Sequence, residues 1–472
     1  MEKYLTDKKE RAKSMNFSEL RAAYPTFTYH GYTMRAAEDA LEIVYDFSIE
    51  GLCEFHPTWR IPCTPPTDPE TDAALRRLVF SLGMTELVSY WKITCSPKVR
   101  ILCGALPESL TAWWKRLYFG GLGEFFYRNG IETDFDAFMQ ISYEGTLSDD
   151  TPSQKPLSGK LIPIGGGKDS IVTLNLLKDQ LSDACAYQIN HRDSSAKAAV
   201  LAGIAPQRML EAKRTLDPNM LECNRKGFLN GHTPFSAIVA FSGVLTAYLN
   251  GIGMVVLSNE SSASEATVSM SAQEVNHQYS KSFEFEQDFY AYEQEFLKVG
   301  VRYFSLLRPL TEFQIARYFA ALPTEFHEVF RSCNVGAKQD CWCGRCAKCL
   351  FVSVILSPFL PRSEVTRLLG ADMLDIAELS ETLAELCGAL PNKPFECVGS
   401  RKEVNISLCL AIANAQARGE ALPKLLAEYR NRPLYAQYRE IAAEFGQEWD
   451  ENHHLPKELE LLVKRECVER FA

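Results

Sequence analysis

The chain has 472 residues, 46% hydrophobic and 23% charged, so it can bury the cores of two or three globular domains. Its formal charge of −10 argues against extended nucleic-acid binding, which needs several Lys and Arg side chains on one face. The charged segment Met1–Arg11 does not resemble a secretory signal, and 15 cysteines without such a signal indicate reduced thiols. We therefore expect a soluble cytoplasmic protein with no nucleic-acid or membrane partner.

Residues 1–156 are predicted to form an N-terminal α+β domain that ends in a polar, proline-bearing linker. Strands are expected at Leu41–Ile49 and Leu52–Arg60, where aromatic and branched residues flank a central turn. Helices are expected at Ala73–Trp91 and Glu108–Asn129. We recognise no catalytic motif in this part of the sequence.

Residues 157–330 alternate between strand and helix patterns, which predicts an α/β domain with a parallel sheet core. The uncharged stretch Phe235–Leu257 is predicted to be a buried helix, a turn and a buried strand, because Asn250–Gly253 interrupts it. Thr233 is expected to cap this helix, with Pro234 at its first position. The predicted strands are Lys160–Ile164, Ala184–Asn190, Gly253–Ser258 and Val301–Leu306.

Residues 331–472 are predicted to form a helical C-terminal region that begins with a cysteine cluster. The cluster consists of Cys341, Cys343, Cys346 and Cys349, and the last three have C-x2-C-x2-C spacing. Four thiolates in tetrahedral geometry form a typical structural zinc site. Two interpretations stay open: bound Zn²⁺, or reduced thiols packed beside a helix that starts near Cys346.

The segment Leu161–Ser170 contains the most informative pattern, an apolar strand that runs into three glycines and a helix start. Glycines let backbone N–H groups approach a polyphosphate, and the helix N-terminus adds its positive dipole end. Lys168 adds a cation and Ser170 a hydroxyl group. The turn is not a Walker A motif, because Asp169 follows the lysine. Its residues are Gly165, Gly166, Gly167, Lys168, Asp169 and Ser170.

Two other polar clusters, Asn190–Asp193 and Ser258–Ser262, also follow predicted strands. Ligands of open α/β sheets bind beyond the carboxyl ends of the strands, so we expect both clusters and the glycine turn to face one crevice. Glu260 or Glu265 could hold Mg²⁺ together with phosphate oxygens, because Mg²⁺ usually binds one or two carboxylates.

Histidine, lysine, tyrosine and cysteine side chains are the candidates for proton transfer. His232 precedes the helix expected after Thr233, where a neutral imidazole could act as a base or bind phosphate; alternatively it fixes a turn. His277, Tyr279 and Lys281 cluster in a long polar loop of the kind that is often functional. Cys397, in a basic segment, is a weaker candidate.

The turn Gly165–Ser170 resembles the S-G-G-x-D-S signature of the PP-loop ATP pyrophosphatases, which split ATP into AMP and pyrophosphate. Gly165 stands where that superfamily has a serine, so one hydroxyl group is missing. The resemblance implies a PP-loop sheet core that binds ATP through this turn, with Asn190 nearby. It also implies Mg²⁺ bound by Asp169 and Glu260.

Several segments together resemble the bacterial UDP-N-acetylmuramoyl-L-alanyl-L-glutamate epimerases, a family of ATP-dependent peptidoglycan enzymes. The resemblance implies conversion of the terminal L-glutamate of UDP-MurNAc-L-Ala-L-Glu to D-glutamate. Adenylation of a carboxylate, with release of AMP and diphosphate, would precede proton transfer by His232, His277, Tyr279 or Lys281. The matching segments are Gly165–Ser170, Gly231–Phe235, Ser258–Glu260, Val275–Lys281 and Lys348–Val352.

Two alternatives stay open. One is another PP-loop ligase that adenylates a carboxylate, similar to 7-cyano-7-deazaguanine synthase, in which ammonia attacks the anhydride. The other is a non-catalytic ATP-binding regulator with a degenerate turn, which Gly165 supports. Retention of Gly166, Gly167, Asp169 and Ser170 argues against the regulator.

Overall fold

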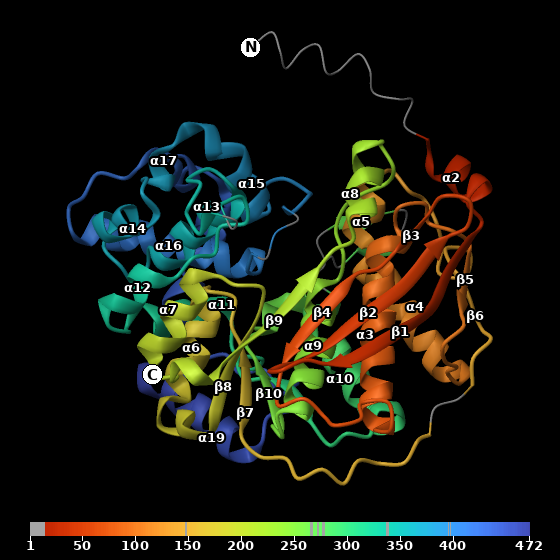
Figure 1. The fold of residues 1–472 in the computed structure, drawn as a ribbon. Coiled ribbons are helices and arrows are strands. Elements are labelled where there is room, and N and C mark those ends of the chain that lie inside the picture. The colour runs from red at the N-terminus through yellow and green to blue at the C-terminus, as the bar shows by residue number, and fades with distance from the viewer. Residues whose placement is uncertain are drawn as a thin grey trace. The chain divides into compact units, whose positions relative to one another are not determined.

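The computed structural model groups the chain into two compact units, and neither is one contiguous segment (Figure 1). Unit 1 comprises residues 1–158, 211–253 and 284–302, and unit 2 comprises residues 159–210, 254–283 and 303–472. The three segments predicted from the sequence, 1–156, 157–330 and 331–472, stay a prediction. The structure describes residues 15–146, 149–264, 268–270, 273–275, 279–336, 339–394, 396 and 398–472.

Unit 1 contains a mixed sheet. Strand β1 pairs antiparallel with β2 and parallel with β5, which in turn pairs parallel with β6. Strand β2 also pairs antiparallel with β3 and β4, and β4 pairs antiparallel with the end of β9. The strands are β1 (Thr26–Ala36), β2 (Ala40–Ile49), β3 (Cys53–Phe55), β4 (Thr58–Pro62), β5 (Lys98–Ile101), β6 (Gln140–Tyr143) and β9 (Met209–Thr215).

The helices of unit 1 include the predicted helix Ala73–Trp91, which α3 confirms with the same bounds. Most of α3 is buried, and its Ser81 and Thr85 hydroxyls donate to the carbonyls four residues earlier, at 2.7 and 3.0 Å. The helix packs against α9. The helices are α2 (Phe17–Ala23), α3 (Ala73–Trp91), α4 (Glu108–Gly121), α5 (Gly123–Arg128), α8 (Pro218–Arg225), α9 (Phe235–Leu249), α10 (Phe283–Tyr292) and the π-helical turn η5 (Glu293–Leu297).

Three predictions for unit 1 differ from the structure in detail. The strand expected at Leu52–Arg60 is divided into β3 and β4, because Pro57 has no N–H group for the sheet. Pro234 is the N-cap of α9 rather than its first residue, and Leu122 separates α4 from α5. None of the helices in the described part of the chain combines the length and the apolar character needed to cross a bilayer.

Unit 2 is built on four strands in the order β13-β10-β7-β8, and β7 pairs parallel with both β10 and β8. These strands confirm the four that the sequence predicts, with ends that differ by at most one residue. A separate antiparallel pair is formed by β11 and β12. The strands are β7 (Lys160–Pro163), β8 (Ala184–Ile189), β10 (Met254–Leu257), β11 (Val268–Met270), β12 (Gln273–Val275) and β13 (Arg302–Ser305).

Helix α13 lies at the centre of the helical part of unit 2. Its residues Lys348–Leu356 are all buried, and it packs against α11, α15 and α16. The helices are α6 (Lys168–Leu176), α7 (Asp193–Ala202), α11 (Glu312–Ala320), α12 (Thr324–Val329), α13 (Ala347–Leu356), α14 (Arg362–Leu369), α15 (Ser380–Cys387), α16 (Arg401–Ala417), α17 (Lys424–Arg430), α18 (Pro433–Tyr438) and α19 (Lys457–Cys467). Short 3-10 turns are η1 (Lys178–Asp183), η2 (Pro206–Arg208), η3 (Ser261–Ser264), η4 (Tyr279–Lys281), η7 (Met373–Asp375), η8 (Ala377–Leu379), η9 (Ile441–Glu444) and η10 (Glu469–Phe471).

Candidate active site

The glycine turn connects β7 to α6 in unit 2, as the sequence predicts. Gly167 is the N-cap of α6, and no side chain caps the helix. The first N–H groups of an α-helix have no partner within the helix, and without a capping side chain at Gly167 an anion can bind them. The Ser170 hydroxyl donates to the Gly167 carbonyl at 3.0 Å, so it closes the turn from inside.

Two glycines of this turn have different steric surroundings. Gly166 has a φ of +76°, and a Cβ atom there would lie 2.5 Å from the Ser194 Oγ. A Cβ atom at Gly165 would meet no atom within 4 Å. The structure therefore requires glycine at position 166, whereas position 165 has room for the serine that the PP-loop signature contains.

Lys168 is buried beside the turn, with 2% of its side chain exposed. Its ammonium donates to the Asp169 carboxylate at 2.5 Å and to that of Glu312. Burial alone would lower the pKa of Lys168, but these two carboxylates outweigh it and raise the pKa above its ordinary value. The lysine that the sequence assigned to phosphate is thus held between two acids in this structure.

Three carboxylates converge next to Lys168. Ligand oxygens of Asp169, Glu260 and Glu312 all lie within 4.8 Å of one another. Burial opposes ionisation of Asp169, but the charges of Lys168 and Lys348 hold its pKa below its ordinary value. Burial raises the pKa of Glu312 despite the opposing charge of Lys168. A cluster of carboxylate oxygens at this spacing fits a hard divalent cation such as Mg²⁺.

Glu312 was missed by the sequence analysis, which named Asp169 and Glu260. The sequence pattern that could have located Glu312 is the capping box of α11. There the Thr311 side chain accepts from the Gln314 N–H, and the Gln314 side chain accepts from the Thr311 N–H. That pattern places Glu312 at the first position of the helix. No rule of spacing connects this position to Asp169, because α11 lies far along the chain.

Hydrogen bonds fix the loop that carries Glu260. The Arg308 guanidinium, which is buried, donates to the carbonyls of Glu260 and Lys281, each at 2.8 Å. The Thr173 hydroxyl of α6 lies 2.8 Å from that of Ser258 at the start of the loop. These contacts hold the end of β10 beside α6, so the clusters predicted after β7 and β10 do meet.

The other predicted residues of unit 2 have mixed outcomes. Asn190 follows β8 with a φ of +56°, and its side chain is exposed. Tyr279 is buried in η4, whereas Lys281 contributes a positive charge that lowers the pKa of Asp169. His277, Glu265 and Cys397 lie outside the described residues.

His232 belongs to unit 1, where it precedes α9. Its Nδ1 lies 3.3 Å from an Oε2 of Glu124, whose other oxygen accepts from the Arg128 guanidinium at 2.6 Å. About 30% of the histidine side chain is exposed, so a ligand can reach it. A histidine held by a carboxylate in this way has its ring orientation fixed, which suits proton transfer.

Lys92 is a buried lysine beside His232 that the sequence analysis missed. Its ammonium donates to the carbonyl of Gly231, the residue before the histidine. Burial, with a smaller contribution from the charge of Arg214, lowers the pKa of Lys92 to about 8. A lysine directly after the apolar helix α3 resembles an ordinary helix end, so nothing in the sequence marks it.

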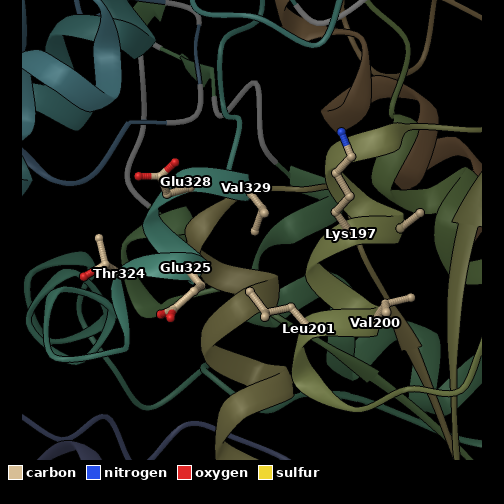
Figure 2. A pocket seen from close by; sticks show the side chains of 8 residues that line it. Lys197, Val200, Leu201, Thr324, Glu325, Glu328 and Val329 are labelled. Carbon is tan, nitrogen blue, oxygen red and sulfur yellow. The ribbon is translucent and has the colours of Figure 1, made fainter.

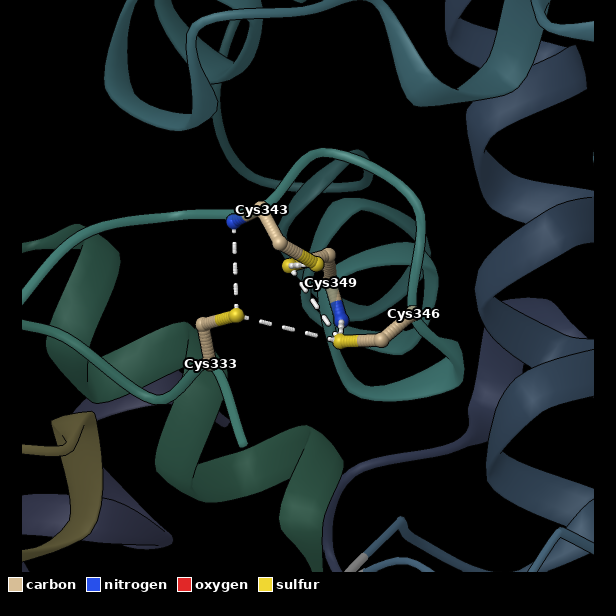
Figure 3. A group of neighbouring side chains, drawn as sticks. All are labelled: Cys333, Cys343, Cys346 and Cys349. Atoms are coloured by element: carbon tan, nitrogen blue, oxygen red, sulfur yellow. Dashed lines mark hydrogen bonds between the residues drawn. The ribbon is translucent and has the colours of Figure 1, made fainter. Parts of the chain in front are cut away.

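Four cysteine sulfurs meet at the start of α13, but they are not the four that the sequence predicts (Figure 3). The group contains Cys333 together with Cys343, Cys346 and Cys349, whereas Cys341 is exposed and lies outside it. Cys333 precedes the close-spaced run, so spacing alone did not include it. The helix begins at Ala347 with Cys346 as N-cap, as expected.

An apolar groove lies elsewhere on unit 2, between α7 and α12 (Figure 2). None of the predicted site residues within the described ranges lines it. The lining residues are Ala196, Lys197, Val200, Leu201, Thr324, Glu325, Glu328 and Val329.

The fold and the site define a mixed α/β protein with a candidate anion- and cation-binding centre at the carboxyl ends of parallel strands. Residues 18–306 match the family model described as the MurL N-terminal domain, and residues 329–438 match the MurL C-terminal domain. The chain belongs to the UDP-N-acetyl-alpha-D-muramoyl-L-alanyl-L-glutamate epimerase family.

Three curated relatives carry that enzyme's name. The protein of Salinispora tropica is 36% identical over 81% of this chain and 84% of its own length. The proteins of a Micromonospora species and of Xanthomonas oryzae pv. oryzae are each 34% identical, over 85% and 74% of this chain and 90% and 78% of their own lengths. No solved structure matches the chain.

Proposed function

We propose that this protein is an ATP-dependent epimerase of peptidoglycan synthesis, which converts the terminal L-glutamate of UDP-MurNAc-L-Ala-L-Glu to D-glutamate and releases AMP and diphosphate. Its relatives are named for the epimerase activity on that substrate. The observation that carries the ATP-dependent part is the glycine turn Gly165–Ser170 beside three converging carboxylates.

The chemistry of the substrate explains why such a site would be needed. Removing the Cα proton beside a free carboxylate builds negative charge next to negative charge. Adenylation of the carboxylate gives a mixed anhydride, whose carbonyl oxygen can accept the charge of the carbanion. A base then takes the proton, an acid returns one to the opposite face, and water releases AMP and the D-glutamyl product.

The glycine turn is the proposed diphosphate site, in a core of the PP-loop type. Backbone N–H groups of Gly166, Gly167 and the start of α6 would bind phosphate oxygens, with the dipole of the helix behind them. Mg²⁺ would bind Asp169, Glu260 and Glu312 and neutralise charge on the phosphates. In that state Lys168 would exchange its carboxylate partners for a phosphate oxygen.

The proposed proton-transfer groups come from two places. His232, held by Glu124 in unit 1, has the required exposure and a fixed ring. Beside His232, Lys92 is a positioning residue: it donates to the Gly231 carbonyl and keeps the backbone before the histidine in place. Lys281 and Tyr279 in unit 2, and His277, stay candidates for the second group.

Purified protein with ATP, Mg²⁺ and UDP-MurNAc-L-Ala-L-Glu tests the proposal. We expect AMP formation, D-glutamate after hydrolysis of the product, and incorporation of deuterium at the glutamate Cα in heavy water. Unchanged L-glutamate without AMP would refute the epimerase proposal. Product formation that depends on ammonia would indicate an amidating ligase, and ATP binding without AMP under any condition would indicate a regulator.

A further inference from the structure

The sulfurs of Cys333, Cys343, Cys346 and Cys349 form a compact group in unit 2 (Figure 3). Cys333 and Cys346 lie 3.9 Å apart, Cys343 and Cys349 3.8 Å, and Cys346 and Cys349 3.5 Å. All four sulfurs lie within 4.8 Å of one another, and the structure records each as a free cysteine. Four thiols from two segments of chain are thus brought to one point without disulfide bonds.

This spacing matches a single tetrahedral ion. With zinc–sulfur bonds of about 2.3 Å, the edge of a tetrahedron of sulfurs is about 3.8 Å. Iron and sulfide ions of an iron–sulfur cluster would lie between the cysteine sulfurs and hold them farther apart. We propose that Cys333, Cys343, Cys346 and Cys349 bind one structural Zn²⁺.

The backbone around the sulfurs favours their thiolate form. Cys333 Sγ accepts from the N–H groups of Gly336 at 3.1 Å and Cys343 at 3.3 Å. Cys346 Sγ accepts from the N–H of Cys349 at 3.4 Å, at the positive end of α13. Such outer contacts orient ligands and stabilise negative charge on sulfur. Four protein ligands also close the coordination shell, so the ion is structural and not catalytic.

The ion would fasten a segment that touches the glycine turn. The segment 331–346 carries three of the four cysteines, and its Arg331 N–H donates to the Gly166 carbonyl at 2.7 Å. Its Asp340 carboxylate accepts from the Ser194 N–H at the start of α7, at 2.8 Å. A Cβ atom at Gly167 would lie 2.9 Å from the Ser332 Oγ. Zinc therefore positions Arg331 and Ser332 against the glycine turn. This positioning role, unlike the zinc site itself, rests on the proposed ATP site.

Metal content of the purified full chain tests the site directly. Protein from cells grown with added zinc, and from parallel cells grown with added iron, is analysed by elemental mass spectrometry. We expect one zinc per chain in both preparations. Protein without stoichiometric metal, or with iron in place of zinc, would overturn the assignment.

Two variants distinguish the four ligands from the fifth cysteine. Cys333→Ser should lose the zinc, and the matched control Cys341→Ser should keep it. Loss of zinc from both, or from neither, would contradict the ligand set. Because Cys333→Ser could fail to fold, the wild-type chain and Cys341→Ser are also loaded with Co²⁺. Both should show the visible bands of cobalt bound by four thiolates in a tetrahedron; a spectrum of octahedral cobalt would overturn the proposal.

Chelation separates the positioning role from the proposed function. Removing zinc from the wild-type chain should weaken ATP binding, measured by calorimetry, and zinc addition should restore it. Zinc that can be removed with no change in ATP binding would refute the positioning role. If the zinc-loaded chain does not bind ATP at all, the proposed ATP site fails while the zinc site stands.

Discussion

The carboxylate centre of unit 2 contains Asp169, Glu260 and Glu312, and the histidine cluster of unit 1 contains His232, Glu124 and Lys92. The pKa of the buried lysine is shifted in opposite directions in these two places. In the first, the buried Lys168 is shared by Asp169 and Glu312, so the cation and the two carboxylates compensate one another's charge. In the second, burial brings the pKa of Lys92 down to about 8, and His232 stays partly exposed beside Glu124. A charged, pre-paired site suits binding of a polyphosphate and metal, whereas a partly exposed histidine held by a carboxylate suits proton transfer. The two halves of the proposed reaction should therefore fail separately.

Asp169→Asn should produce the largest effect. The change removes one proposed metal ligand and the charge that pairs with Lys168, so AMP formation should fall at least about 100-fold. The exposed Asp179→Asn, in η1, is the matched control and should keep full activity. AMP release is measured by chromatography, and circular dichroism checks the fold. Normal AMP release from a folded Asp169→Asn protein would show that the carboxylate centre is not the activating site.

His232→Gln should affect only the second half of the reaction. Deuterium incorporation at the glutamate Cα should fall about 100-fold or more, because a general base contributes that much. AMP release should continue, since water still hydrolyses the activated carboxylate. His30→Gln, at an exposed histidine of β1, serves as control. Equal losses of exchange and AMP release in His232→Gln would mean that this histidine binds substrate instead.

The paired variants Gly166→Ala and Gly165→Ser test the shape of the turn. Alanine at 166 would adopt a left-handed φ of +76°, which costs about 1–2 kcal/mol, and would crowd the Ser194 hydroxyl. We expect a lower melting temperature and about tenfold weaker ATP binding. Gly165→Ser should lower neither the melting temperature nor the affinity for ATP, because a Cβ atom there meets no atom within 4 Å. Equal effects from both variants would contradict this account of the turn.

Lys92→Met should have the smallest effect, one visible mainly through pH. The pKa of Lys92 falls from 10.5 when unfolded to about 8 when folded, so between these values the unfolded chain binds the extra proton. The free energy of unfolding of the wild type should therefore rise with pH, relative to Lys92→Met, by about 1 kcal/mol per pH unit between about pH 8 and 10. Urea titrations of both proteins measure this difference. A difference that does not change with pH would show that the lysine is not desolvated.

Sequence patterns predicted the helices and strands well, because hydrophobic periodicity and capping residues act within one segment of chain. Helix α3 has the predicted bounds, and the glycine turn lies between β7 and α6 as expected. Asp169 and Glu260 lie close together, as expected for polar residues that follow neighbouring buried strands, and their role as metal ligands stays a prediction.

The residues that the sequence analysis missed have in common that their local sequence does not mark them as unusual. Glu312 begins a helix, Cys333 precedes a dense cysteine run, and Lys92 ends an apolar helix, so each has an ordinary local explanation. The partners of Glu312 and Lys92 are distant in the chain, so only tertiary packing brings them together. Cys333 lies just 10 residues before Cys343, but outside the close spacing that marked the cluster. For the same reason the spacing of Cys341 to Cys343 suggested a ligand where the structure has an exposed side chain.

The chain crosses from one unit to the other five times, and this affects how it can fold during synthesis on the ribosome. The chain changes unit after residues 158, 210, 253, 283 and 302. Unit 1 therefore receives its last segment only when residue 302 has left the ribosome, and unit 2 must wait still longer. Neither can finish folding as a simple N-terminal domain would during translation. In a partly synthesised chain, strands whose pairing partners lie in later segments keep unpaired edges until those segments emerge.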